Sequence, residues 1–199
     1  MAFYYISDLH LCHENIIRLD NRPFDSLTEM HRALLENWNM TVKPEDTVYI
    51  LGDFCWAKEE EWLRIVPQFL GKKVLILGNH DLKQFGKPLK RQFQSIQDYM
   101  EITDTGRHVI LSHYPMPFHR AAYNKDCYML FGHVHATREN DLMNRLREDI
   151  RADCTERGRA RGNFVNVGCM MPWMDYTPRT LDEIIRFSGL WPENKNTEV

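Results

Sequence analysis

The sequence lacks several features that would place it in a familiar class of protein. Its five cysteines are scattered and include no Cys-x-x-Cys pair, so they predict free thiols in a reducing compartment rather than a disulfide framework. No apolar run approaches the roughly 20 residues of a membrane span. The first residues carry no basic stretch of the kind that opens a signal peptide. We therefore expect a soluble, cytoplasmic protein with no membrane association.

Positive charge is also in short supply. Lys and Arg number 25 against 28 Asp and Glu, which gives a net charge of −3. A sequence-independent grip on duplex nucleic acid needs a strongly basic face, so stable duplex binding is not expected. The chain has 199 residues and no internal repeat. This length predicts a single domain over residues 1–190, followed by a polar tail over 191–199.

Apolar patterns predict an alternation of strands and helices. Short runs rich in branched and aromatic side chains predict strands at residues 2–7, 47–51, 74–77, 107–112, 126–131 and 163–167. Helical spacing predicts helices at 13–19, 27–41, 58–70 and 181–187, with an inserted amphipathic helix between 138 and 161, whereas 82–98 is expected to be loop and broken helix. Such alternation implies βαβ units and an α/β fold.

Side chains that can bind metals follow five of the predicted strands. They are Asp8 and His10, Asp53, Asn79 with His80 and Asp81, His113, and His133 with His135. Because strand side chains repeat every two residues, the Asp-x-His and His-x-His pairs each point to one side of an extended segment. Carboxylate, imidazole and amide together suit Mn, Fe or Zn better than Ca, which prefers oxygen alone. The pattern predicts a metal centre at the carboxyl ends of the strands.

This ordered set of motifs resembles the calcineurin-like metallophosphoesterase superfamily. The motifs are Asp8-x-His10, Gly52-Asp53, Gly78-Asn79-His80-Asp81, Ser112-His113 and Gly132-His133-x-His135. The stretches 13–24 and 166–168 also resemble a small bacterial and phage branch of that family. The resemblance implies a sandwich of two mixed β-sheets flanked by helices, with a dinuclear metal centre on one rim.

The resemblance also implies which side chains hold each metal. One ion would be held by Asp8, His10, Asp53 and His135, and the other by Asp53, Asn79, His113 and His133. Asp53 would bridge them, since two cations about 3.5–4 Å apart repel and need a shared anion. Manganese is the favoured metal, with iron, zinc, nickel and magnesium as alternatives.

The implied reaction is hydrolysis of a phosphate ester by metal-activated water, with His80 as the general acid. Protein-phosphatase members carry a second Asp three residues after the bridging one, and then an Arg. Here Phe54-Cys55-Trp56-Ala57 follows instead. Asp81 is the candidate to orient His80, although capping of a nearby helix is an equal alternative.

The phosphate also needs a partner. Arg22 is the candidate anchor, with Asn79 and His13 as further substrate contacts, although a surface ion pair for Arg22 and a supporting role for His13 stay open. The favoured function is a phosphodiesterase acting on a small or nucleotide-like substrate. The alternatives are a phosphomonoesterase or a non-catalytic interaction scaffold of the same fold. The oligomeric state is not readable.

Replacing His80 by Ala or Asn tests the assignment of the general acid. The variants should keep bound metal but lose about 10²–10⁴-fold in turnover on esters with poor leaving groups, because the departing alkoxide is no longer protonated. Steady-state kinetics beside a metal-binding titration measure both properties. Unchanged turnover on an alkyl ester would defeat the assignment.

Overall fold

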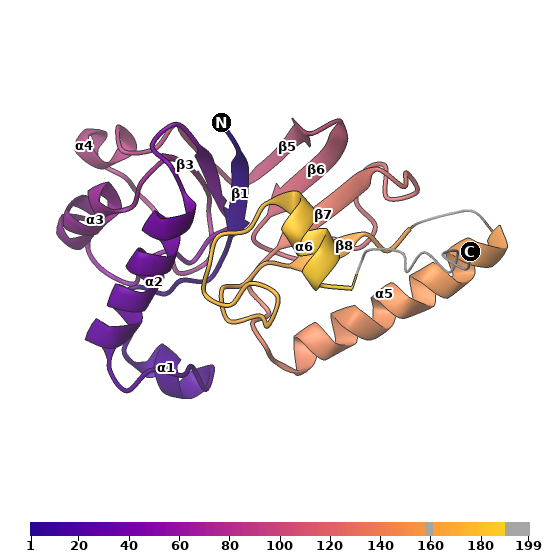
Figure 1. The fold of residues 1–199 in the computed structure, drawn as a ribbon, viewed down its shortest axis with the longest axis horizontal. Helices are drawn as coiled ribbons and strands as arrows, with labels where there is room; N and C mark the ends of the chain where they lie inside the picture. The colour runs from indigo at the N-terminus through magenta and orange to yellow at the C-terminus, as the bar shows by residue number, and fades with distance from the viewer. Residues whose placement is uncertain (158–160, 190–199) are drawn as a thin grey trace, which may run out of the picture.

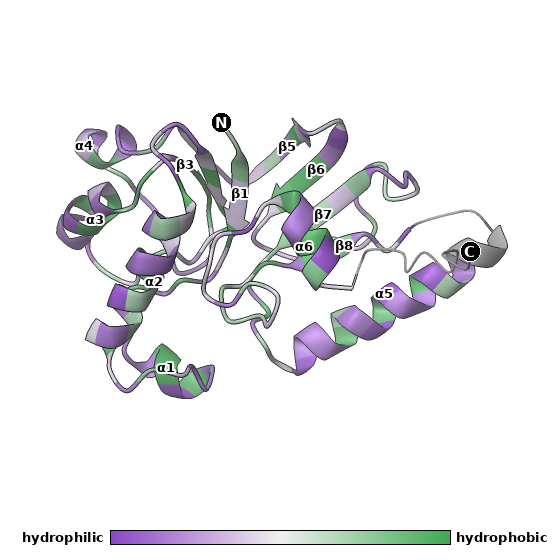
Figure 2. Ribbon diagram, viewed as in Figure 1, coloured by the Kyte–Doolittle hydropathy of each residue, from purple (hydrophilic) through white to green (hydrophobic). Residues whose placement is uncertain are grey.

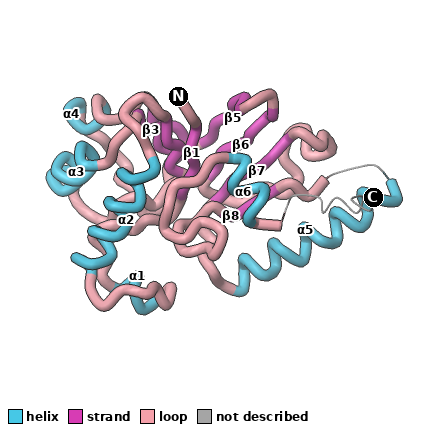
Figure 3. Tube along the Cα trace, in the orientation of Figure 1, coloured by secondary structure: helices cyan, strands magenta, loops and turns pink. Residues whose placement is uncertain are grey.

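The structure is a computed structural model that describes residues 1–157 and 161–189. Eight strands form two four-stranded sheets, with the helices on their outer faces (Figures 1 and 3). The predicted fold class is confirmed. The tail predicted over 191–199, with residue 190 before it, lies outside the described residues. None of the described helices is long and apolar enough to cross a membrane.

The first sheet is parallel throughout its pairings. Its strands lie in the order β1 (Phe3–Ile6), β2 (Thr47–Ile50), β3 (Lys72–Ile76) and β4 (Ser95–Gln97). Parallel neighbours need crossover connections, and helices supply them: α1 (Asn15–Leu19), α2 (Leu27–Thr41), α3 (Glu59–Ile65) with a 3₁₀ turn (Val66–Gln68), and α4 (Lys87–Lys90). All four residues of β2 are buried, as expected for a central parallel strand.

The second sheet is the mixed one. Its order is β5 (Tyr99–Asp104), β6 (Arg107–Ser112), β7 (Cys127–Phe131) and β8 (Phe164–Asn166), with β5 antiparallel to β6 and the other pairs parallel. Helix α5 (Arg138–Arg157) connects β7 to β8, and α6 (Leu181–Phe187) follows β8. The sequence predicted two mixed sheets. The second sheet is mixed, whereas the first is entirely parallel.

One apolar core joins the two sheets. It includes Ile6 and Ile50 from the first sheet and Leu111 and Leu130 from the second, all at most 1% exposed. A smaller cluster beneath α5 includes Met129, Phe131, Phe164 and Ile150. Figure 2 shows α5 hydrophilic along most of its length, with scattered hydrophobic turns. This helix covers the outer face of the second sheet with a narrow apolar stripe, as its sequence predicts.

Two edge regions differ from the sequence prediction. The segment 82–98 contains β4, and β5 follows directly, although no strand was predicted at either place. Most residues of both strands are at least partly exposed, so neither strand shows the apolar run of a buried strand.

The helix predicted over 58–70 is shorter than expected. α3 ends at Ile65, and a 3₁₀ turn that contains Pro67 follows, because proline cannot donate a helical hydrogen bond.

Candidate metal centre

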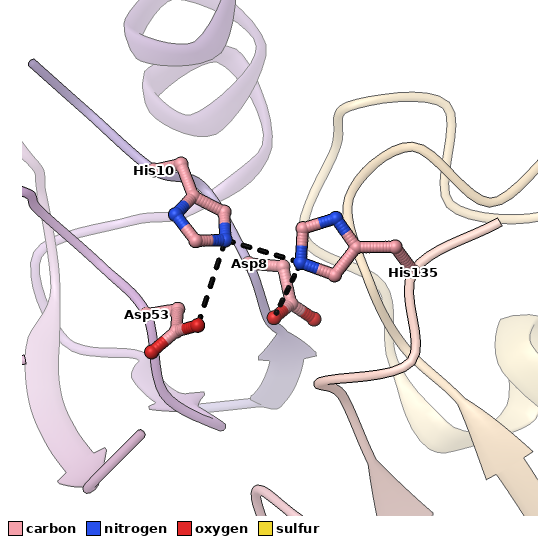
Figure 4. Close-up of side chains that lie close together, drawn as sticks. All are labelled: Asp8, His10, Asp53 and His135. Atoms are coloured by element: carbon pink, nitrogen blue, oxygen red, sulfur yellow. Dashed lines mark hydrogen bonds and ion pairs between the residues drawn. The ribbon is translucent and has the colours of Figure 1, made fainter. Parts of the chain in front are cut away.

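Four predicted ligands converge where β1, β2 and β7 end. One donor atom from each of Asp8, His10, Asp53 and His135 lies within 4.8 Å of all the others (Figure 4). The two imidazole Nε2 atoms are 3.1 Å apart, and Asp8 Oδ1 lies 3.6 Å from His135 Nε2. Both carboxylates and His10 are almost completely buried. The four side chains point at a common centre from three different loops.

Asp53 also faces a second group of ligands. Its Oδ2 lies 3.5 Å from His10 Nε2 and 3.5 Å from His113 Nε2. His113 Nε2 in turn lies 3.0 Å from Asn79 Oδ1. The ring of His133 contacts that of His113, with 5.1 Å between centroids. This group is more open than the first, because Asn79 and His133 are exposed to solvent.

The charge state of these side chains fits divalent cations. Burial lowers the pKa of His10, and the neighbouring charges of His135 and Arg22 lower it further, so the ring is the neutral imidazole that metals bind. Burial raises the pKa of Asp53, and the nearby Asp8 adds to the rise although His113 opposes it. Donor atoms of the two buried carboxylates lie within 4.8 Å of each other, and a bound cation would offset their repulsion. The donor set therefore fits a metal site.

The ligand loops have an unusual backbone. Asp8, His10, Asp53, His133 and His135 all adopt left-handed conformations, with φ between 46° and 70°. Non-glycine residues seldom do so, and each costs about 1–3 kcal/mol unless the surroundings hold it. Such conformations concentrate at functional sites. Five of the seven predicted ligands share this feature, which the sequence motifs alone did not indicate.

Two glycines in the motifs let the backbone approach the carboxylates. A Cβ atom at Gly78 would collide with the side chain and backbone nitrogen of Asp53. A Cβ atom at Gly132 would collide with the side chains of Ser7 and Asp8. The glycines of the Gly-Asn-His-Asp and Gly-His-x-His motifs are therefore required by close contact with the ligands.

Hydrogen bonds orient two of the imidazoles. His135 Nδ1 donates to Asp20 Oδ1 at 2.7 Å, and His113 Nδ1 donates to the Leu51 carbonyl at 2.8 Å. Each bond leaves Nε2 free to face the centre. Burial lowers the pKa of His135, but the bond to Asp20 and the charge of Asp8 outweigh it, so the pKa is raised overall. Asp20 was missed from the sequence, because it lies in the turn after α1 and belongs to no motif.

A buried amide joins the loops after β7 and β8. Asn166 Nδ2 donates to the carbonyl of His135 at 2.9 Å and to Asn140 Oδ1 at 3.1 Å. Its Oδ1 accepts from the backbone of Gly168. The stretch 166–168 therefore supports the ligand loop without contributing a ligand.

Comparisons with known proteins agree with this geometry. A family model described as calcineurin-like phosphoesterase matches residues 1–137. The chain belongs to the calcineurin-like phosphoesterase family. An uncharacterised protein of Methanocaldococcus jannaschii is 34% identical over 151 residues, which is 74% of this chain and 78% of the relative.

Two further proteins are similar to this chain. The gene 66 protein of Mycobacterium phage D29 is 33% identical over 128 residues, covering 56% of this chain and 63% of the phage protein. A crystal structure of a protein of unknown function from Aquifex aeolicus shares 32% identity and a TM-score of 0.65, covering 92% of this chain and 97% of that one. The family identified from the motifs is confirmed.

Arg22 does not lie where a phosphate anchor would. Its side chain is buried beneath the ligand loop, where it donates to Asp20 Oδ2 and to the carbonyls of Asp8 and Leu9. Its remaining contact is with the sulfur of Met30. No N–H of this guanidinium is left for a substrate. The suggested substrate contact through Arg22 is therefore corrected: the residue holds Asp20, which holds His135.

Asp81 faces away from the cleft. Its two carboxylate oxygens accept from the backbone N–H groups of Asp53, Phe54 and Gly78, at 2.8–2.9 Å. Burial raises its pKa to about 6, and the bonds from Gly78 and Phe54 offset only part of that rise. Asp81 thus ties together the loops after β2 and β3. Of the two alternatives for this residue, the contacts favour a structural role over the catalytic one.

His80 and His13 both line a cleft of about 470 Å³ above the ligands. The backbone N–H of His80 donates to Asp53 Oδ1 at 2.8 Å, which fixes the loop beside the bridging carboxylate. The rings of both histidines stack on Trp56. Both positions are compatible with the expected roles, which are substrate contact for His13 and proton donation for His80.

The Asp20 contact makes a prediction about metal affinity in this phosphoesterase. Asp20→Asn replaces the charged partner of His135 with a neutral amide, so metal affinity should fall about 10–100-fold. Calorimetric titration of metal-free protein with Mn²⁺ measures the change. The control is Asp25→Asn, which removes the same charge from an exposed position nearby. Equal affinities in the two variants would contradict the supporting role of Asp20.

The Asp81 contacts predict a stability effect. Asp81→Ala leaves three backbone N–H groups without their acceptor, two of them in buried hydrogen bonds, and each buried orphaned group costs about 1–3 kcal/mol. Thermal unfolding should show a large fall in Tm, with Asp81→Asn intermediate because its amide keeps one acceptor oxygen. An unchanged Tm together with lost turnover would restore the catalytic interpretation.

Proposed function

We propose that the chain is a dinuclear metal-dependent phosphoesterase that hydrolyses a small or nucleotide-like phosphodiester. One observation carries the proposal: Asp53 Oδ2 is equally far, 3.5 Å, from an imidazole of each ligand group. A carboxylate that lies between two groups of metal-binding side chains is the arrangement that a bridging ligand needs. One apolar core across both sheets supports a single domain over residues 1–190.

Seven residues would hold the two ions. Asp8, His10, Asp53 and His135 form the first site, and Asp53, Asn79, His113 and His133 form the second. When bound, divalent metals supply an activated water and neutralise charge on the phosphoryl oxygens. Manganese suits this mixture of carboxylate, imidazole and amide, and iron, zinc, nickel and magnesium remain possible occupants.

His80 supplies the proton to the leaving group. The residue lines the cleft, and its backbone N–H donates to the bridging carboxylate, which supports a place for His80 beside a phosphate bound at the metals. A general acid in this place contributes about 10²–10⁴-fold to the rate. His13, which lines the cleft, and Asn79, which is exposed beside His113, would contact the substrate or its phosphate oxygens.

The charges in the cleft favour a diester over a monoester. Among the described residues that line it, none is lysine or arginine, whereas Asp20 and Glu139 are present. A hydrogen bond from Thr137 lowers the pKa of Glu139, which keeps this side chain ionised. A phosphodiester carries one negative charge and a monoester close to two, so the monoester meets more repulsion.

The apolar wall of the cleft supports the same choice. Ile16, Leu19 and Val134 line it beside the histidines. A diester has a second organic group that can cover such a surface, and a monoester has none.

The cysteines support a cytoplasmic location. Cys12, Cys55, Cys127 and Cys169 are free thiols, as expected in a reducing compartment.

An assay with two chromogenic esters tests the proposed function. Metal-free protein loaded with Mn²⁺ should hydrolyse bis-p-nitrophenyl phosphate with a higher kcat/KM than p-nitrophenyl phosphate. Asp53→Asn should abolish both activities, because the bridging charge is lost. Glu139→Gln should raise the monoester rate more than the diester rate.

Three results would overturn the proposal. A higher kcat/KM on the monoester would favour a phosphomonoesterase instead. Turnover of neither ester, with metal binding established by titration, would favour the non-catalytic scaffold. An Asp53→Asn variant that keeps full activity would remove the bridging role on which the proposal rests.

A further inference from the structure

We propose that Trp56 is the positioning residue of His80, holding the imidazole over the metal centre by ring stacking. The inference rests on the proposed function and names the restraint on its general acid. Trp56 lies three positions after Asp53 and lines the cleft together with His80. A carboxylate orients a histidine by a hydrogen bond, whereas an indole must do so through its face.

The rings form a three-layer stack. The centroids of Trp56 and His80 are 4.3 Å apart with 29° between the planes, and those of Trp56 and His13 are 4.4 Å apart with 16° between the planes. Two nearly parallel imidazoles on one face of an indole would touch each other. No His13–His80 ring contact occurs within the described residues, so the two histidines lie on opposite faces of Trp56.

The indole is fixed to the same loops as the metal ligands. The Trp56 backbone N–H donates to the Leu11 carbonyl at 2.7 Å, one residue after His10. Leu11 also forms a parallel bridge with Cys55. Trp56 therefore keeps a fixed position relative to His10 and Asp53, and it passes that position on to His80.

Other restraints on the His80 ring are weak. Within the described part of the chain, no side chain hydrogen-bonds to this imidazole, and its one other ring neighbour is His10, at 5.7 Å between centroids. His80 is exposed to solvent and would sample several rotamers without the indole. A misplacement of about 1 Å in a reacting group can cost about 10²-fold in rate.

The stack also decides what Trp56 does not do. An exposed aromatic ring in a cleft is often a platform for a nucleobase. Here Trp56 is 44% exposed, but a histidine ring stacks on each of its faces. The indole therefore already stacks against two protein rings and is not a free platform for a nucleobase.

Turnover of diesters with different leaving groups by the Mn²⁺-loaded enzyme tests whether Trp56 positions His80. Trp56→Leu should lower kcat about 10–100-fold on a diester with an alkyl leaving group, since the acid is misplaced and the metal site is intact. Release of His13 from the indole should change KM to the same extent on all diesters. The substitution should barely affect kcat on bis-p-nitrophenyl phosphate, whose leaving group needs no proton. Trp56→Phe should restore most of the loss, because the phenyl ring still stacks.

A double variant separates positioning from a general packing effect. In a His80→Ala background, Trp56→Leu should cause no further loss of kcat on the alkyl ester. An additional loss there, or an equal loss on both esters in the single variant, would show that Trp56 acts otherwise and would overturn the proposal. Thermal unfolding of Trp56→Leu confirms that the variant is folded.

A measurement independent of activity distinguishes this proposal from the proposed function. The indole ring current should move the imidazole C–H signals of His80 upfield in the NMR spectrum, with His80→Asn giving the assignment and Trp56→Leu abolishing the shift. An active wild type without the shift would overturn the role of Trp56 alone. A shifted His80 in a wild type that hydrolyses no ester would support the stack and overturn the proposed function alone.

Discussion

The carboxylate of Asp53 has to lie between two imidazoles, and most of the structure around it serves that placement. Three loops from the first sheet and two from the second must meet within a few ångströms. They do so at a cost in backbone strain, since five ligands adopt left-handed conformations. Gly78 permits the closest approach, because any side chain there would displace the Asp53 carboxylate. The two-sheet architecture supplies the rigidity that holds these loops in place.

A layer of buried polar groups lies beneath the ligands and turns them toward the centre. Arg22 holds Asp20, and Asp20 holds the ring of His135. Asp81 binds the backbone beside Asp53. Unpaired buried charges are strongly unfavourable, so each group in this layer is useful only while its partners are present. The consequence is that charged residues that look like catalytic candidates in the sequence serve as supports in the folded protein.

The sequence was most informative where chemistry and spacing coincide. Motifs at strand ends predicted the family and the buried cluster of Asp8, His10, Asp53 and His135, because the carboxyl ends of strands meet at one rim. Asp20 could not be found, since its contact with His135 spans 115 positions and depends on the turn after α1. The burial of Arg22 was equally hidden, because no local pattern distinguishes a surface arginine from one beneath a loop. β4 and β5 were missed because partly exposed edge strands show no long apolar run.

The bond between Asn166 and His135 joins positions that are 31 residues apart. The whole of α5 lies within the loop that this contact closes (Figure 1). The entropy cost of closing a loop grows only with the logarithm of its length, so a longer or shorter segment between His135 and Asn166 would change the free energy of folding little. The geometry of the ligand loops therefore depends little on the length of the helix. Past Ile150, the last residue of α5 in the cluster beneath the helix, α5 is a segment that evolution can lengthen, shorten or exchange while the ligand loops keep their geometry.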